Sequence, residues 1–135
     1  MNRRLLLCLP LTLVACTTSP PPAPPLAGRW QPVAAQLGGR EFPVTGFRGA
    51  VLELRADTYE FGADRGRVSL RATAVPAQMD IQGESGPNAG KSIPAIYALQ
   101  NDELVICYQL GSGPRPTAFD SVAGSQLLLV RYRRT

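Results

Sequence analysis

The segment Gly86-Pro-Asn-Ala-Gly-Lys-Ser92 has the composition of a phosphate-binding loop. Such a loop needs four residues between its glycines and a helix after them, so that backbone N–H groups meet the phosphate at the helix start. Here three residues lie between Gly86 and Gly90, and the strand-like run 93–99 follows. The spacing therefore predicts a connecting loop rather than a phosphate site.

The sequence offers two nucleophile candidates: Cys107, and the adjacent residues Lys91 and Ser92. Both candidates lack the partner groups that catalysis requires. The chain contains no histidine, which excludes a Ser-His-Asp triad, a Cys-His dyad and a His-ligated zinc ion. Cys107 follows the apolar run 104–106, so we expect a buried thiol with no activating neighbour. A Ser-x-x-Lys dyad would need serine at position 88, which is Asn88.

The 10 acidic residues are scattered over turns and short strands and mark no carboxylate pair for glycoside hydrolysis. We therefore expect no catalytic residue, no metal site, no cofactor and no enzymatic activity. Ligand binding is the remaining chemistry. Tyr97, Tyr108, Trp30 and Phe119 could line the mouth of a cavity, or they could fill a solid core. Arg115, held between two prolines, could bind an anionic group, or it could lie in a solvated loop.

Residues 1–16 have the features of an export signal. Arg3 and Arg4 precede the apolar stretch Leu5–Val14, which is too short to span a bilayer as a helix. The ending Leu-Val-Ala-Cys16 resembles the bacterial lipobox, which implies that Cys16 becomes the mature N-terminus and carries a lipid on its sulfur. The alternatives are an ordinary secretory signal with a coincidental cysteine, or a membrane helix.

Residues 17–25, with the sequence Thr-Thr-Ser-Pro-Pro-Pro-Ala-Pro-Pro, predict an extended spacer. At about 3.1 Å per residue it would hold the following domain on the order of 30 Å from a membrane. A proline-rich ligand for a partner domain is the alternative. Thr17 stands where an aspartate would favour retention in the inner membrane. We therefore expect an exported protein anchored to the outer membrane, facing the periplasm.

Removal of the signal changes both the cysteine count and the net charge. Cys8 leaves with the signal and Cys16 is acylated, so Cys107 has no partner for a disulfide. Loss of Arg3 and Arg4 leaves 12 of 14 basic residues against 10 acids, a net charge of +2. This weak charge, with only 18% charged residues overall, argues against a nucleic-acid partner.

Residues 26–135 predict an all-β domain. Short alternating or apolar runs recur between Gly, Pro, Asn and Asp residues, and we find no amphipathic helix. Strands are expected at 28–37, 50–56, 59–61, 67–75, 79–83, 93–99, 103–110 and 126–133. Short connections favour an up-and-down antiparallel barrel of about eight strands, with a β-sandwich as the alternative.

The motif Gly28-Arg29-Trp30 resembles the G-x-W that opens lipocalin-like barrels. The segments 85–92, 93–99, 104–108, 114–119 and 127–130 follow in an order similar to a small uncharacterised lipocalin-like family best known from planctomycetes, with its G-P-x-x-G-K and R-P-x-x-F patterns. The resemblance implies that Trp30 plugs one end of the barrel. It further implies that an arginine of the last strand, Arg131 or Arg133, packs across the indole. Arg29 and the short connection 62–66 depart from the family pattern.

These observations predict a membrane-anchored binding domain for a small apolar or amphiphilic molecule, acting as a monomer. The alternative is a protein-binding envelope accessory or a barrel that acts as a protease inhibitor. The family has no established activity, so the resemblance implies a shape and no chemistry.

Overall fold

Short turns rich in Gly, Asn and Asp divide the chain into nine strands and one 3-10 turn in the computed structural model, which describes residues 26–135. The elements are β1 (Gly28–Leu37), β2 (Arg40–Glu41), η1 (Val44–Phe47), β3 (Leu52–Leu54), β4 (Thr58–Phe61), β5 (Asp64–Arg71), β6 (Ala77–Ser85), β7 (Ser92–Gln100), β8 (Glu103–Gln109) and β9 (Leu127–Arg134). The predicted lipid attachment at Cys16 and the predicted tether 17–25 lie outside the described residues. Within residues 26–135, no helix has the length and apolarity to cross a membrane.

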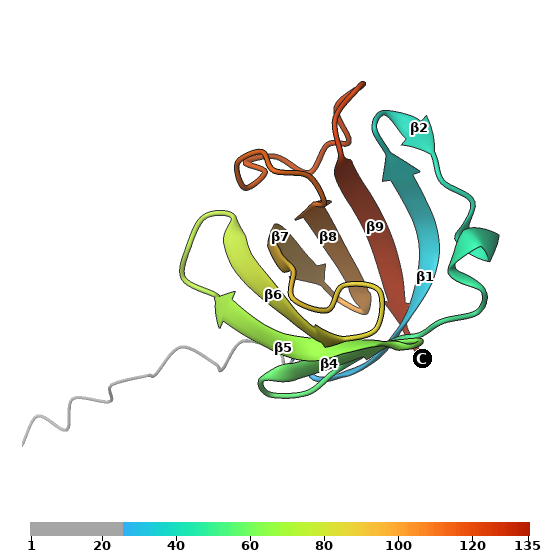
Figure 1. Cartoon of the computed structure of the whole chain (residues 1–135), viewed down its shortest axis with the longest axis vertical. Coiled ribbons are helices and arrows are strands. Elements are labelled where there is room, and N and C mark those ends of the chain that lie inside the picture. The colour runs from blue at the N-terminus through green and yellow to red at the C-terminus, as the bar shows by residue number, and fades with distance from the viewer. Residues whose placement is uncertain (1–25) are drawn as a thin grey trace, which may run out of the picture.

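The sheet closes on itself because β1 pairs with both ends of the remaining strand order. From β3 to β9 each strand pairs antiparallel with the next, and β1 pairs with β3 and with β9 (Figure 1). The first residues of β1 meet β3, and Trp30 to Leu37 meet β9. β2 is a two-residue extension that pairs only with β1. The other strands form a closed up-and-down barrel, which confirms the predicted fold and excludes the sandwich.

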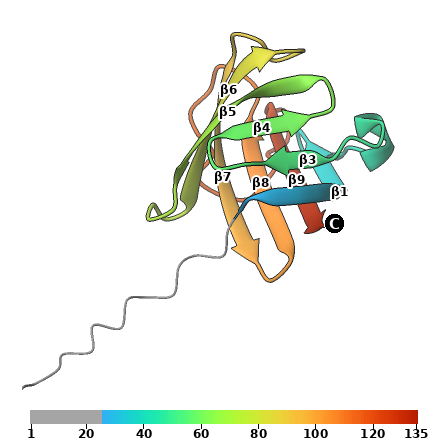
Figure 2. The ribbon, with the colours of Figure 1, turned by 90° about the horizontal axis from the view of Figure 1, so that it is seen from below.

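Strand alternation fills the barrel with apolar side chains. The core includes Leu52 and Leu54 from β3, Val68 from β5, Met79 from β6 and Ile106 from β8. Seen from below, β3, β4 and β5 cross over β7, β8 and β9, so that two curved walls enclose this core (Figure 2). Each long strand turns one set of alternate residues inward and the other set outward.

Two predicted strands are shorter than expected. The strand expected at 67–75 ends at Arg71, and residues 72–76 form the turn to β6. Strand alternation would place Leu70 on the same side as the buried Val68, but Leu70 is 40% exposed. The reason is that β4 pairs with β5 only as far as Arg67, so the later residues of β5 lack a neighbour on that side. The strand expected at 50–56 is likewise only Leu52–Leu54.

The connection between β8 and β9, residues 110–126, covers part of the outer surface of the barrel. Ile96 and Cys107 are fully buried although they do not belong to the interior core. The backbone carbonyl of Asp120 lies 3.7 Å from the Cys107 sulfur. This connection therefore forms a second small layer over β7 and β8.

Candidate functional site

The interior core leaves a cavity of about 100 Å³ that runs toward the surface. Its deep wall includes Met79, which is 1% exposed, together with Leu54 and Val68. Its outer lining includes Leu110, which is 44% exposed, and Phe47. The cavity is therefore an apolar pocket that narrows into the barrel.

Polar groups from five segments converge on this cavity. The lining includes Tyr59 of β4, Asp64 of β5, Asn88 of the β6–β7 loop, Tyr108 of β8 and Tyr132 of β9. The Asn88 amide Nδ2 donates a hydrogen bond of 2.7 Å to Asp64 Oδ2. The Tyr108 and Tyr132 hydroxyls form a buried hydrogen bond of 2.7 Å. We call these five side chains the polar cluster.

Two buried atoms of the polar cluster have no hydrogen-bond partner among the described residues: the Tyr59 hydroxyl and Asp64 Oδ1. Tyr59 is 6% exposed and Asp64 is 8% exposed. Buried polar side chains in folded proteins are nearly always hydrogen-bonded, and an unpaired one costs ~1–3 kcal/mol. Both atoms belong to the lining of the same cavity, and the Tyr59 hydroxyl is close enough to Asp64 for the two groups to interact.

Burial and negative charge shape the electrostatics of the polar cluster. Burial raises the pKa of Tyr59 to about 12, and the nearby Asp64 carboxylate and Glu84 charge add to the shift. Burial also raises the pKa of Tyr108 and of Tyr132. All three hydroxyls are therefore neutral at physiological pH. No Lys or Arg side chain belongs to the lining of this cavity.

The β6–β7 loop places Asn88 over the cavity through close backbone packing. The Gly83 N–H donates to the Lys91 carbonyl, and the Gly90 N–H donates to the Gly83 carbonyl, both at 2.9 Å. A Cβ atom on Gly83 would clash with the Asn88 carbonyl, so a side chain there would push the loop away. The loop is followed by β7 and not by a helix, which confirms that the segment is a connecting loop. The glycine spacing of this loop is visible in the sequence, whereas its contact with Asp64 arises only from the fold.

The structure separates the three residues that the sequence suggested for ligand binding. Tyr108 lines the cavity as a member of the polar cluster. Tyr97 is buried in the core, 8% exposed, but is not part of the cavity lining. Arg115 lies outside the barrel wall, where its Nη1 donates to the Met79 and Ala95 carbonyls at 3.1 and 2.9 Å. It also pairs with Asp80, so it bridges the connection 110–126 to β6 and β7.

Tyr59, Asp64 and Asn88 were missed in the sequence. Each belongs to a short strand or loop of ordinary composition, and the pairing of β4, β5 and β6 is what brings them together. The available signal was the alternation of β5, which places Asp64 on the inward side with Gly66 and Val68. Asp64 stands two residues before Gly66, where a Cβ atom would collide with the backbone of β6.

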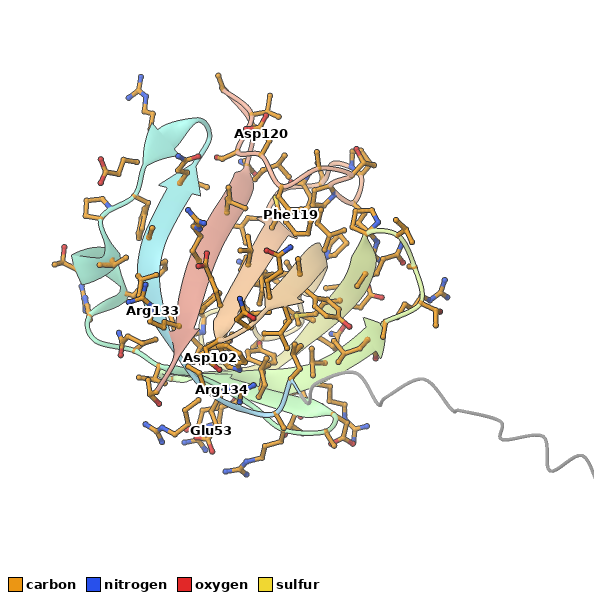
Figure 3. The ribbon with its side chains drawn as sticks, turned by 180° about the vertical axis from the view of Figure 1, so that it is seen from behind. Glu53, Asp102, Phe119, Asp120, Arg133 and Arg134 are labelled. Carbon is orange, nitrogen blue, oxygen red and sulfur yellow. The ribbon has the colours of Figure 1, made fainter. Side chains whose placement is uncertain are left out.

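Trp30 is fully buried at the end of the barrel where β1 begins and β9 ends. Its indole N–H donates to the Leu26 carbonyl at 3.0 Å. The guanidinium that covers it belongs to Arg134, 4.2 Å from the ring centroid, and not to Arg131 or Arg133 as expected. Arg134 shares the inward side of β9 with Tyr132, whereas Arg131 turns outward and pairs with Glu103. Figure 3 shows Arg133 and Arg134 at this end of the barrel.

Cys107 is fully buried, and burial raises the pKa of its thiol. This confirms the expected small apolar role in packing. No cluster of three or more His, Cys, Asp or Glu side chains suited to a metal ion occurs in residues 26–135.

A larger depression of about 570 Å³ lies on the outer surface of β1, β7, β8 and β9. Its lining includes the small side chains of Ala34 and Ala98 together with Phe119 of the connection 110–126, which is labelled in Figure 3. Its charged residues, Arg131 and Glu103, pair with each other at 2.8 Å. This depression therefore presents no polar group that requires a ligand.

The candidate site is assigned from its geometry alone. No protein-family model, curated protein or solved structure matches the chain. The fold is a small β-barrel compatible with ligand binding, and the cavity with its polar cluster is the candidate site.

Proposed function

We propose that the domain binds a small amphiphilic molecule inside the barrel. The apolar part of the molecule packs against Leu54, Val68 and Met79, and its polar group meets Tyr59 and Asp64. One observation carries the proposal: two buried polar atoms without partners, Tyr59 Oη and Asp64 Oδ1, lie in the same apolar cavity. A ligand group that pairs with both atoms removes their desolvation cost and gains apolar contact around them.

The size of the cavity limits the ligand. Sites for drug-sized molecules begin at about 300 Å³, and an apolar cavity of about 150 Å³ accepts benzene. The cavity here is about 100 Å³, which fits a molecule of a few heavy atoms. A longer ligand would place only its polar end beside Asp64 and leave its tail at the rim beside Leu110.

Titration of isotope-labelled protein with short alcohols, amines and carboxylic acids, followed by NMR, tests this site. We expect at least one compound to shift the signals of Tyr59 and Asp64. The variant Val68→Phe fills the cavity and should abolish these shifts, whereas Tyr97→Phe, which changes a core residue outside the cavity, should retain them. Absence of binding in every class, or equal binding by Val68→Phe, would refute the proposal.

We further propose that this binding domain is anchored at a membrane. A lipid on Cys16 anchors the protein to the outer membrane facing the periplasm, and residues 17–25 hold the barrel off the surface. The lipobox and the proline content support this arrangement. Membrane fractionation of Cys16→Ser tests it: the variant should be unprocessed or leave the membrane fraction, and an unchanged distribution would show that Cys16 is not the anchor.

The G-x-W opening and the Trp30–Arg134 contact support a relationship to lipocalin-like barrels as part of the same proposal. The absent histidine and the buried Cys107 support a role without catalysis. We propose that the protein acts as a monomer and binds no nucleic acid, in keeping with its small net charge.

Protein binding is a second candidate function, favoured by the turn between β5 and β6. Val75 at this turn is 99% exposed, and no charged residue occurs from Ala72 to Met79. Such a tip could enter an apolar pocket of an envelope protein. A photo-reactive residue at position 75 should form a defined adduct with one protein in intact cells, and the same residue at Ser69 should not. Equal labelling from both positions would exclude this role.

A further inference from the structure

The geometry points to a primary ammonium group as the polar part of the ligand, an inference that rests on the proposed function. The ligand class would be a short alkylamine, or the amine end of a longer molecule. The observation behind this choice is a buried carboxylate that faces an apolar cavity without a basic side chain in its lining.

Asp64 is only half satisfied by the protein. Its Oδ2 accepts the Asn88 amide at 2.7 Å, and its Oδ1 has no partner among residues 26–135. A neutral amide compensates a buried negative charge less well than a cation does, because hydrogen bonds between two charged groups are the stronger ones. A cation that reached Oδ1 would supply both the missing donor and the missing charge.

Tyr59 completes the receptor for such a group. Its hydroxyl is buried in the same cavity and unpaired, and it stays neutral, so its oxygen can accept a hydrogen bond. An ammonium group carries three donors and can therefore serve Asp64 Oδ1 and Tyr59 Oη together. An alcohol can donate to Asp64 Oδ1 and accept from the Tyr59 hydroxyl, but it brings no positive charge to the carboxylate. A carboxylate would bring a second negative charge beside Asp64.

The rest of the cavity wall also suits a cation on an alkyl chain. The lining contains five aromatic side chains, Phe47, Tyr59, Phe61, Tyr108 and Tyr132, and aromatic faces attract cations. The charge of Glu84 contributes to the raised pKa of Tyr59 and adds negative potential near the cavity. Glu84 also pairs with Arg67 at 3.1 Å. The aliphatic side chains Leu54, Val68 and Met79 provide the surface for the chain.

The test compares three molecules of one shape: n-butylamine, n-butanol and butyrate. Their affinities for the whole protein are measured by NMR titration at neutral pH. We expect n-butylamine to bind at least about tenfold more tightly than n-butanol, as a charge-assisted hydrogen bond predicts, and butyrate to bind weakest. In Asp64→Asn, the affinity for n-butylamine should fall about tenfold, and that for n-butanol should change little. The control Asp57→Asn, which alters an exposed carboxylate, should match the wild type.

The outcomes separate the two proposals. If n-butanol binds but n-butylamine has no advantage, or if Asp64→Asn keeps that advantage, the ammonium assignment is wrong and the binding site stands. If none of the three molecules binds, both proposals fail. Should Asp64→Asn not fold, Asp64→Ser, which also removes the negative charge, decides the question in its place. It should reduce the preference for n-butylamine about tenfold, and an unchanged preference would overturn the inference.

Discussion

Arg134 lies opposite Trp30 in the ladder between the first and last strands, with its guanidinium carbon 4.2 Å from the centroid of the indole ring. The same guanidinium donates to the Ala27 carbonyl at 3.0 Å. These contacts tie the beginning of β1 to the end of β9 at the point where the barrel closes. Gly28 makes the approach possible, because its φ of +142° and the position of Arg134 leave no room for a side chain.

Loss of the Arg134 side chain should weaken this closure. We expect Arg134→Ala to lower the free energy of unfolding by ~1–2 kcal/mol, through lost cation–π attraction and a lost hydrogen bond to a backbone carbonyl. Urea unfolding followed by Trp30 fluorescence measures the effect. The neighbouring Arg133→Ala is the control, since that exposed side chain turns outward. Equal losses for the two variants would contradict the assigned contact.

The hydrogen bond between the Tyr108 and Tyr132 hydroxyls should show strong coupling. Tyr108→Phe leaves a buried hydroxyl on Tyr132 without its partner, which should cost ~1–3 kcal/mol. Adding Tyr132→Phe removes the second hydroxyl, so the double variant should be less destabilised than the sum of the single ones. Chemical unfolding of the three variants gives the coupling energy. Strict additivity would show that the two hydroxyls do not interact.

Stability should fall at alkaline pH because of the tyrosines. Burial raises the pKa values of Tyr59, Tyr97, Tyr108 and Tyr132 in the folded state, that of Tyr59 to about 12. In the unfolded chain they titrate near 10, so above this pH the folded state holds more protons than the unfolded state. The tyrosine contribution is therefore complete below about pH 10 and is lost as the pH rises through 12.

Urea unfolding at successive pH values, with phenolate absorbance recorded in parallel, checks this prediction. The protein unfolded in urea is the control and should show all its tyrosines titrating near pH 10. The same titration in the folded protein would contradict the burial of these hydroxyls.

Arg115 should stabilise the outer layer rather than bind a ligand. It holds the connection 110–126 to β6 and β7 through the Met79 and Ala95 carbonyls and Asp80. We expect Arg115→Met, which keeps most of the apolar stem, to destabilise the domain by ~1–3 kcal/mol, because two buried carbonyls lose their donor. Loss of Arg115 should also open this layer and expose the Cys107 thiol. A thiol reagent should therefore react faster with Cys107 in the variant than in the wild type. A stability and a thiol reactivity unchanged from the wild type would exclude the bridging role.

Much of the fold was predictable because strand alternation is a local property. The strands at 93–99 and 103–110, the end of the first strand at residue 37 and the burial of Cys107 all follow from short stretches of sequence. The choice of Arg131 or Arg133 over Arg134 was wrong for a physical reason that is also local. Val130 and Tyr132 face inward, and the same alternation continues to Arg134.

By itself, the sequence determined where most of the strands lie and which face of each paired strand is apolar, because side chains alternate with a period of two. Only the tertiary structure decided that β1 pairs with β9 to close a barrel, since this pairing joins segments about as far apart as the described chain allows. It also decided the site. Tyr59, Asp64 and Asn88 converge through the register of three hairpins, and no local pattern specifies which inward-facing residues of different strands meet in the remaining space.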